Sequence, residues 1–261
     1  MKQVLLKGEG IRKVFGKKQD EVKILDGVDV EIYKGDFTVI MGASGAGKST
    51  LLYALSGMDR ISGGKVFYKG NAISGYKEDQ MARLRAREFG FVFQQAHLVS
   101  NLTLFENVAV AGYVNRSGNR NEDGNSSPKA VSQRAEELLK RMGVGQAGGR
   151  LPAQVSGGEA QRAAIARAVI NHPGLIFADE PTGALNKGSS REVMSLLAEL
   201  NEGGQSILMV THDVNTAIHG NRILYMEDGK ILDELNLPKD EREDGRAREA
   251  KVNQWLAFLR W

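Results

Sequence analysis

The chain of 261 residues contains no cysteine, which excludes a disulfide framework and any metal site built on thiolates. Long apolar runs are also missing, and none approaches the roughly 18 residues of a membrane-spanning helix. The segment Met1–Lys7 has only three consecutive apolar residues, too few for a signal peptide. We therefore expect a protein of a reducing cytoplasm with no membrane span, whose membrane role, if it has one, depends on a partner.

A strong excess of one charge is absent as well. The 35 basic and 32 acidic residues give a net charge of +3, spread evenly along the chain. Nucleic-acid binding usually needs a clustered positive surface, so we expect no nucleic-acid partner. The hydrophobic content of 41% is enough for a full core.

Short apolar runs are present and alternate with helical patterns. Residues 37–41, 175–178 and 207–210 read as buried strands, and residues 22–33 alternate as an antiparallel strand does. Helices are indicated at 49–55 and at 128–142, where Pro128 follows Ser127 and Gly143 ends the apolar stripe. Strands that alternate with helices predict an α/β fold with a largely parallel sheet.

A glycine-rich segment lies between the strand at 37–41 and the helix at 49–55. It has a glycine, four residues and then Gly-Lys-Ser, the pattern of a phosphate-binding loop. The glycines let successive N–H groups point at phosphate oxygens, while Lys48 would neutralise the β- and γ-phosphates and the Ser49 hydroxyl would bind Mg²⁺. The alternative is a flexible surface loop. The predicted contacts to ATP are Gly42, Ala43, Ser44, Gly45, Ala46, Gly47, Lys48, Ser49 and Thr50.

Two acids follow the apolar run at 175–178. Ligands gather at the carboxyl ends of strands in open α/β sheets, which suits Asp179 as a Mg²⁺ ligand through water and Glu180 as the residue that orients or deprotonates the attacking water. The alternative is a strand and turn whose acids face solvent.

The segment Val155–Arg162 begins with a helix N-cap. Ser156 and Glu159 have the spacing of a capping box, and the two glycines between them leave N–H groups uncovered at a helix N-terminus, a site for an anion. Capping boxes are common, so this pattern by itself also fits a purely structural role.

This segment resembles the signature motif of ABC ATPases, and Ser156 lies 23 residues before Asp179, as in that family. The resemblance implies a P-loop, RecA-like core with an antiparallel β subdomain and an inserted α-helical subdomain. It also implies that Phe15 stacks on adenine, that Gln94 touches Mg²⁺ and the membrane partner, and that His212 contacts the γ-phosphate. Alone, Phe15 would read as core and His212 as a capped or core histidine.

The resemblance further implies a head-to-tail homodimer. Each ATP would lie between the phosphate loop of one copy and the signature residues of the other, namely Ser156, Gly157, Gly158 and Glu159. Two positions depart from the family pattern. Asn186 stands where aspartate is common, and the signature has Val155 and Glu159 where leucine and glutamine are usual.

Residues 177–185 and 102–108 resemble one branch of the family, which contains lipoprotein-releasing, macrolide-export and bacitracin-type peptide-resistance transporters. Residues 209–213 and 225–231 look closest to the antimicrobial-peptide group. The resemblance implies an ATPase subunit on the cytoplasmic face of the membrane, bound to a multi-span permease. A soluble ABC ATPase would carry a long coiled-coil insertion or a second ATPase half, and neither is present. A non-hydrolysing regulatory module would be expected to lack Glu180 or His212.

We expect four parts: residues 1–95 with the first half of the ATP-binding core and the β subdomain, 96–160 with the helical subdomain, 161–236 with the second half of the core, and 237–261 with a charged linker and an amphipathic helix. In the last part, Val252, Trp255, Leu256 and Leu259 have helical spacing. This helix docks either on its own core or on a partner protein.

Overall fold

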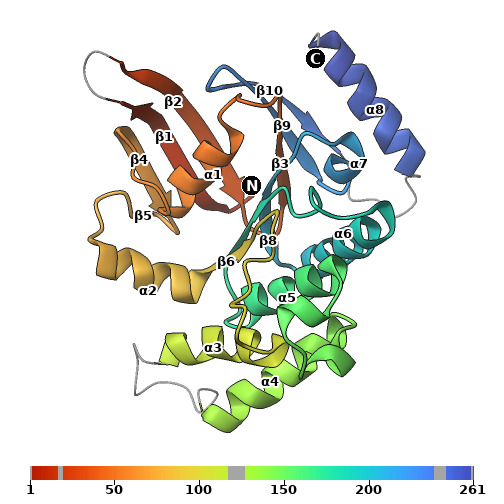
Figure 1. Ribbon diagram of the computed structural model, residues 1–261. Helices are drawn as coiled ribbons and strands as arrows, with labels where there is room; N and C mark the ends of the chain where they lie inside the picture. The colour runs from red at the N-terminus through yellow and green to blue at the C-terminus, as the bar shows by residue number, and fades with distance from the viewer. Residues whose placement is uncertain (1, 17–19, 117–126, 238–244, 260) are drawn as a thin grey trace. The chain divides into compact units, whose positions relative to one another are not determined.

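The computed structural model describes residues 2–16, 20–116, 127–237, 245–259 and 261 (Figure 1). The chain divides into two units: unit 1 comprises residues 1–77 and 198–261, and unit 2 comprises residues 78–197. In the described ranges, none of the helices is both long enough and apolar enough to cross a bilayer. The predicted division at residues 95, 160 and 236 stays a prediction.

The first sheet of unit 1 is antiparallel, with the strand order β2-β1-β4-β5. Leu25, Val28, Val30 and Ile32 of β2 are buried, which confirms the alternation predicted for residues 22–33. The β subdomain of the predicted fold class is therefore present. The bounds of its strands are β1 (Val4–Phe15), β2 (Val22–Tyr33), β4 (Gly63–Tyr68) and β5 (Asn71–Ala72).

The other strands of unit 1 follow the order β10-β9-β3-β8, and β3 lies parallel to both β8 and β9. Every residue of β3 and β8 is buried, which confirms the two buried strands predicted there. Helix α1 follows β3 and packs against β1 and β8. The bounds are β3 (Phe37–Met41), α1 (Lys48–Ser56), β8 (Ser206–Val210), α7 (Val214–Ala217), β9 (Arg222–Glu227) and β10 (Lys230–Asn236).

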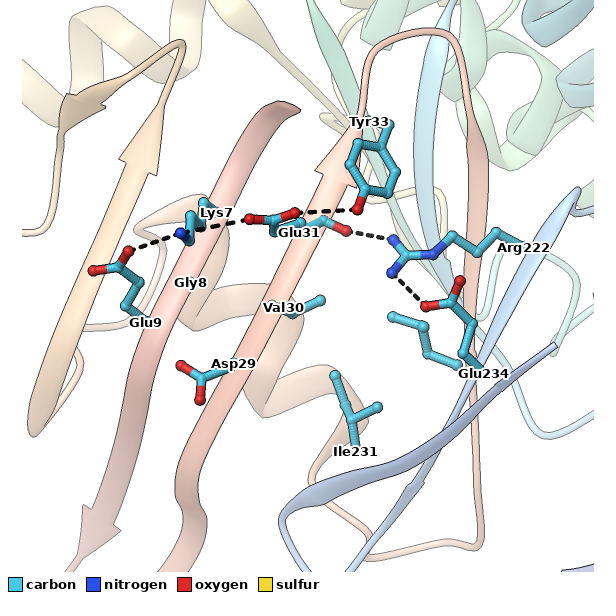
Figure 2. Close-up of a pocket in the computed structure, with 11 residues that line it drawn as sticks. Lys7, Gly8, Glu9, Asp29, Val30, Glu31, Tyr33, Arg222, Ile231 and Glu234 are labelled. Atoms are coloured by element: carbon cyan, nitrogen blue, oxygen red, sulfur yellow. Dashed lines mark hydrogen bonds and ion pairs between the residues drawn. The ribbon is translucent and has the colours of Figure 1, made fainter. Parts of the chain in front are cut away.

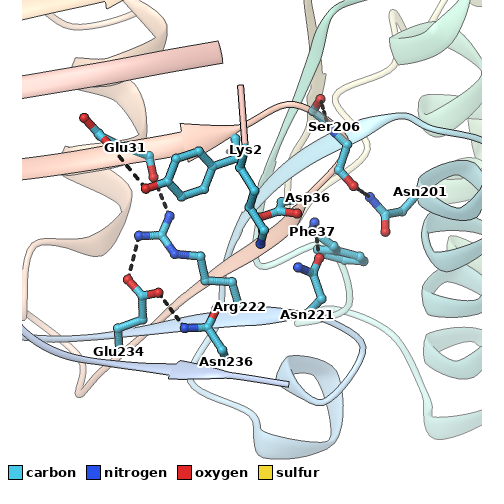
Figure 3. A network of polar contacts seen from close by, with 12 residues as sticks. Lys2, Glu31, Asp36, Phe37, Asn201, Ser206, Asn221, Arg222, Glu234 and Asn236 are labelled. Carbon is cyan, nitrogen blue, oxygen red and sulfur yellow. Dashed lines mark hydrogen bonds and ion pairs between the residues drawn. The ribbon is translucent and has the colours of Figure 1, made fainter. Parts of the chain in front are cut away.

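A polar network joins the two sheets of unit 1 (Figure 3). Arg222 is 6% exposed, and its guanidinium lies 4.9 Å from the centroid of the Tyr33 ring and donates to the Glu31 carbonyl and to Glu234 Oε2. The Lys7 Nζ lies 2.9 Å from Glu9 Oε1 and 3.5 Å from Glu31 Oε1. Lys7 and Arg222 line one pocket with a volume of about 520 Å³ (Figure 2). Because these charges pair with one another, removal of a single partner would leave a charge uncompensated between the two sheets.

Helix α8 (Gly245–Phe258) packs on unit 1 through Val252 and Leu256, both buried. The Trp255 indole N–H donates to Asp233 Oδ2 at 2.8 Å, and its ring meets the Tyr225 ring edge-on at 6.2 Å. These contacts support the interpretation that the helix docks on its own core. Residues 238–244 of the predicted linker lie outside the described residues.

The described part of unit 2 contains the parallel strands β6 and β7, with helices before, between and after them. Phe177 of β7 packs against the rings of Phe89 and Phe91 of β6, at 5.0 and 5.6 Å. Helix α3 packs against α4 and α5. The bounds are α2 (Glu78–Glu88), β6 (Phe89–Val92), α3 (Leu104–Arg116), α4 (Pro128–Arg141), the 3₁₀ turns η2 (Gly145–Ala147) and η3 (Pro152–Gln154), α5 (Gly157–Val169), β7 (Leu175–Asp179) and α6 (Lys187–Glu202), whose last turn belongs to unit 1.

The predicted ends of α4 are confirmed. Ser127 is the N-cap, its hydroxyl accepts from the Ala130 N–H, and Pro128 occupies the first helical position. At the other end, Gly143 has a φ of 70°, a left-handed conformation that ends the helix at little cost for a glycine.

Candidate nucleotide-binding site

The glycine-rich segment lies between β3 and α1, as predicted from its sequence. Two of its glycines are required by the fold. Gly42 has a φ of 154°, and a Cβ there would lie 2.0 Å from the Met226 carbonyl oxygen of β9. Gly47, the N-cap of α1, has a φ of 96°, and a Cβ would lie 3.0 Å from the Ile24 carbonyl oxygen of β2. The loop is thus held tightly by β9 and β2.

Lys48 is the first residue of α1 and is 7% exposed. Its Nζ donates to the carbonyl oxygens of Gly42 and Ala43, each at 2.8 Å, so the ammonium lies over the inner rim of the loop. Ser49 and Thr50 follow in the first helical turn and are half-buried, whereas Ala43, Ser44 and Gly45 are exposed. A positive helix end, an ammonium and an exposed loop together suit a polyphosphate.

Phe15 ends β1 with 46% of its surface exposed, so the interpretation of this residue as core is wrong. The Lys13 Nζ lies 4.6 Å from the centroid of the Phe15 ring. Lys13 is itself 8% exposed and donates to Asp59 Oδ1 at 2.6 Å and to the Arg60 carbonyl at 2.7 Å. The Phe15 ring therefore has a cation beside it and an open surface.

His212 follows β8 and is exposed, so it is neither a core residue nor the N-cap of α7. That cap is Asp213, whose carboxylate accepts from Asn215 and Thr216. Burial raises the pKa of Asp213, but hydrogen bonds from Thr216 and Asn215 outweigh it and hold the pKa below its ordinary value. The cap thus stays charged and fixes the backbone beside His212.

In unit 1 the segments that carry these predicted residues lie close to the phosphate loop. The Thr211 N–H donates to the Ile40 carbonyl at 3.1 Å, so the chain leaves β8 beside the start of the phosphate loop. Phe15 pairs with Val22 of β2, two residues before the Ile24 carbonyl that borders Gly47.

Asp179 ends β7 and Glu180 follows it, both half-buried, in unit 2. The two carboxylates are thus partly withdrawn from solvent. Glu180 has a φ of 44° in the left-handed region, which costs a residue with a side chain on the order of 1–2 kcal/mol. The turn is closed by the Gly183 N–H, which donates to the Glu180 carbonyl at 3.0 Å.

Gln94 lies two residues after β6 and is exposed. Its side chain packs against Gly183, where a Cβ would lie only 3.0 Å from Gln94 Nε2. Unit 2 therefore brings Gln94 against the loop that follows Glu180.

The capping box at the start of α5 is confirmed. Glu159 Oε2 accepts from the Ser156 N–H and hydroxyl, each at 2.8 Å, and the Ser156 hydroxyl accepts from the Glu159 N–H at 3.2 Å. Hydrogen bonds from the backbone and then the side chain of Ser156 lower the pKa of Glu159. The charge that departs from the family pattern is thereby tied to its own helix end. Ser156 and Gly157 remain exposed.

Gly158 is buried because α5 meets the start of α6 there. A Cβ on Gly158 would lie 2.6 Å from Ser189 Oγ, and the Arg162 guanidinium pairs with Glu192 one turn further along. Gly157 borders only Leu185, at 3.5 Å. The two signature glycines therefore differ: one is required by packing inside the chain and the other is open.

Two functional candidates were missed in the sequence. Lys13 lies two residues before Phe15 in β1, the spacing at which strand side chains share a face, and its ammonium contacts the Phe15 ring. Gln161 is a polar residue at 1% exposure on the alanine-rich face of α5, and a buried amide needs partners. The two-residue period of the strand could have indicated Lys13, and the position of Gln161 on the apolar face of a helix could have indicated that residue.

No cluster of three or more acids and histidines that could hold a metal occurs in the described ranges. Mg²⁺ keeps several waters and usually takes only one or two protein ligands besides phosphate. The half-buried Ser49 hydroxyl and the carboxylate of Asp179 have the oxygen chemistry that Mg²⁺ prefers.

Known proteins resemble the chain over most of its length. A family model described as ABC transporter matches residues 25–183. The macrolide export ATP-binding/permease protein MacB of Wolinella succinogenes is 43% identical over 237 residues, which cover 88% of this chain and 34% of the relative. The lipoprotein-releasing system ATP-binding protein LolD of Aquifex aeolicus is 42% identical over 231 residues, 88% of this chain and 97% of the relative.

The chain thus spans about a third of the length of the MacB relatives and nearly all of LolD. Among solved structures, the dimeric ATP-binding cassette MJ0796 in a post-hydrolysis state with ADP and Pi superimposes with a TM-score of 0.81 at 35% identity. The superposition covers 90% of this chain and 100% of the MJ0796 chain.

Proposed function

Since this chain belongs to the ABC transporter family as an ATP-binding and ATP-hydrolysing domain, we propose that two copies enclose two ATP molecules and drive a separate multi-span permease. The observation that carries this proposal is the strand, phosphate loop and helix of unit 1, with Lys48 held over the loop. We propose the cytoplasmic face of the membrane as its location, reached through the permease.

Residues of unit 1 would bind the nucleotide. The exposed ring of Phe15 offers a stacking surface for adenine, and residues Gly42–Thr50 would surround the phosphates. Lys48 would neutralise the β- and γ-phosphates. Mg²⁺ supplies further neutralisation of phosphate charge when bound, and Ser49, Gln94 and Asp179 would hold it.

Residues around the end of β7 would act in hydrolysis. Glu180 would orient or deprotonate the attacking water. Its left-handed backbone is held by the turn to Gly183, which restricts the base of the side chain. His212 would contact the γ-phosphate, and the charged Asp213 cap keeps its backbone in place.

The signature residues would act on the ATP bound by the second copy. The spreading negative charge of the γ-phosphate must be met from both sides, and Ser156 and Gly157 are exposed at a helix N-terminus, where N–H groups favour anions. The dimeric state of the similar MJ0796 cassette supports this arrangement. The capping box holds the Glu159 carboxylate beside Ser156, so its negative charge would lie near the partner's phosphate and weaken ATP binding.

For the cargo we propose antimicrobial peptides, from the resemblance of residues 209–213 and 225–231 to that group. Macrolide export and lipoprotein release are the second candidates, favoured by the 43% and 42% identity to MacB and LolD. Reconstitution with the permease in vesicles would distinguish them, because only the true cargo should stimulate ATP turnover. A lack of stimulation by a bacitracin-type peptide beside a clear response to a macrolide or lipoprotein would reject the peptide assignment.

Glu180→Gln tests the hydrolytic assignment. The amide keeps the shape of the side chain but cannot take a proton, so turnover should fall by at least about 100-fold while ATP affinity stays within about threefold. Turnover and nucleotide binding are measured in the same preparation. Glu137→Gln, at an exposed acid of α4, should leave both unchanged. Near-normal hydrolysis by Glu180→Gln would refute the role of Glu180.

A further inference from the structure

Gln161 lies in the second turn of α5 with 1% of its surface exposed. Its Nε2 donates to the Phe93 carbonyl at 2.7 Å and to the Pro181 carbonyl at 2.8 Å. Both acceptors are main-chain oxygens, so only the amide nitrogen can serve, and its two N–H groups are used by them.

The two acceptors lie beside residues proposed to act in hydrolysis. Phe93 immediately precedes Gln94, and Pro181 immediately follows Glu180. One buried amide on the signature helix thus joins the segment that carries Gln94 to the segment that carries Glu180. The Gln94 side chain also packs on Gly183, so the Gln94 segment contacts the loop after Glu180 directly as well as through Gln161.

We propose that Gln161 is a positioning residue of the ATPase reaction, holding Gln94 and Glu180 in register with the signature helix. This rests on the proposed function. A proline fixes its own φ, so anchoring the Pro181 carbonyl also restricts the peptide that follows the strained Glu180. Gln94 and Glu180 then move together with the start of α5 when Ser156 meets the second copy.

Asn171 provides a matched comparison within the same unit. Its Nδ2 also donates to two main-chain carbonyls, those of Ala86 at 2.9 Å and Ala111 at 3.0 Å. Neither acceptor adjoins a residue proposed to act in the reaction. Loss of the Asn171 amide therefore measures what two such hydrogen bonds contribute to stability alone.

The test compares Gln161→Met with Asn171→Leu, each of similar length to the native side chain and without N–H groups. Gln161→Met should lower Tm at least as much as Asn171→Leu, because Asn171 is half-buried and Gln161 is fully buried. Only Gln161→Met should lower kcat, by about 10- to 100-fold for a misplaced reacting group, with KM for ATP within about threefold because the phosphate loop is untouched. Equal kcat values for the two variants, or a kcat of Gln161→Met near that of the native chain, would overturn the proposal.

Gln161→Leu carries the same test if the methionine variant does not fold, because it also lacks N–H groups and places no charge beside the two carbonyls. The native chain and Glu180→Gln are measured alongside. If both behave as proposed and Gln161 variants keep full kcat, the positioning role fails while the ATPase function stands. Absence of ATP turnover by the native chain in vesicles with its permease would overturn both.

Discussion

At the scale of single residues, polar side chains with more than one partner do most of the positioning. Lys13 joins Asp59 and the Arg60 carbonyl while lying beside the Phe15 ring, and Gln161 joins two distant carbonyls. The residue types at the phosphate loop and at Asp179–Glu180 could be predicted, because their chemistry is local to a short pattern. The partners of Lys13 and Gln161 could not, since they lie 20 to 68 residues away along the chain.

Lys13→Met should raise KM for ATP about two- to fivefold, because a contact between a cation and a ring of about 0.5–1 kcal/mol and the bonds to Asp59 are lost. Steady-state kinetics should give an unchanged kcat. Lys69→Met is the control, since Lys69 lies 5.2 Å from the Tyr68 ring but away from the predicted site. A similar KM for both variants would contradict the role of Lys13 in nucleotide binding.

At the scale of elements, apolar runs were sufficient to predict the continuously buried strands, and capping residues were sufficient to predict where helices start. The strands β3, β7 and β8, the start of α4 and the capping box of α5 were all predicted. Strand β1 was not, because Lys7, Glu9 and two glycines interrupt its pattern. A Cβ at Gly8 would lie 2.9 Å from Ile11 Cγ1 of the same strand and 3.0 Å from Leu55 Cδ2, so these side chains would have to shift.

Gly158→Ala should destabilise the chain by about 1–3 kcal/mol, because the new Cβ overlaps Ser189 at the contact of α5 with α6. Chemical denaturation measures the loss. Adding Ser189→Gly removes the overlapping atoms and should restore most of it, as a double-mutant cycle would reveal. If the double variant is as unstable as the single one, this contact is not the cause.

Gly157→Ala should behave differently. A Cβ there has only an ordinary 3.5 Å contact with Leu185, so stability should change by less than about 0.5 kcal/mol. Turnover should nevertheless fall, because the exposed backbone of Gly157 is proposed to approach the nucleotide of the second copy. Full ATPase activity in Gly157→Ala would count against that approach.

At the scale of the whole molecule, the fold class was predicted correctly, while the division into parts remains a prediction. The α/β strands and the antiparallel sheet are both present. A second copy cannot be read from one chain's hydrophobic pattern, since the proposed contact consists of glycines, a serine and bound phosphate. The permease and the cargo could likewise not be predicted from this chain, because the groups that would recognise them belong to separate molecules.

Composite sites predict complementation between damaged chains. Lys48→Ala should disable phosphate binding by the loop, and Ser156→Arg should block the signature residues from the partner's ATP. Each variant alone should therefore be inactive. A mixed dimer keeps one intact site, and an equal mixture should regain up to about a quarter of native turnover if pairing is random. Turnover per chain should also fall on dilution. Native activity of Ser156→Arg alone would reject the two-copy arrangement.

The chain has two tryptophans, Trp255 and Trp261, and both belong to the end of α8 or follow it. Trp255 is hydrogen-bonded to Asp233 and packs on Tyr225, whereas Trp261 is 44% exposed. Intrinsic fluorescence excited near the red edge of indole absorption therefore comes from this helix and its immediate vicinity. Undocking of α8 would move Trp255 into water and shift its emission to longer wavelength, so the native chain carries its own optical reporter of that contact.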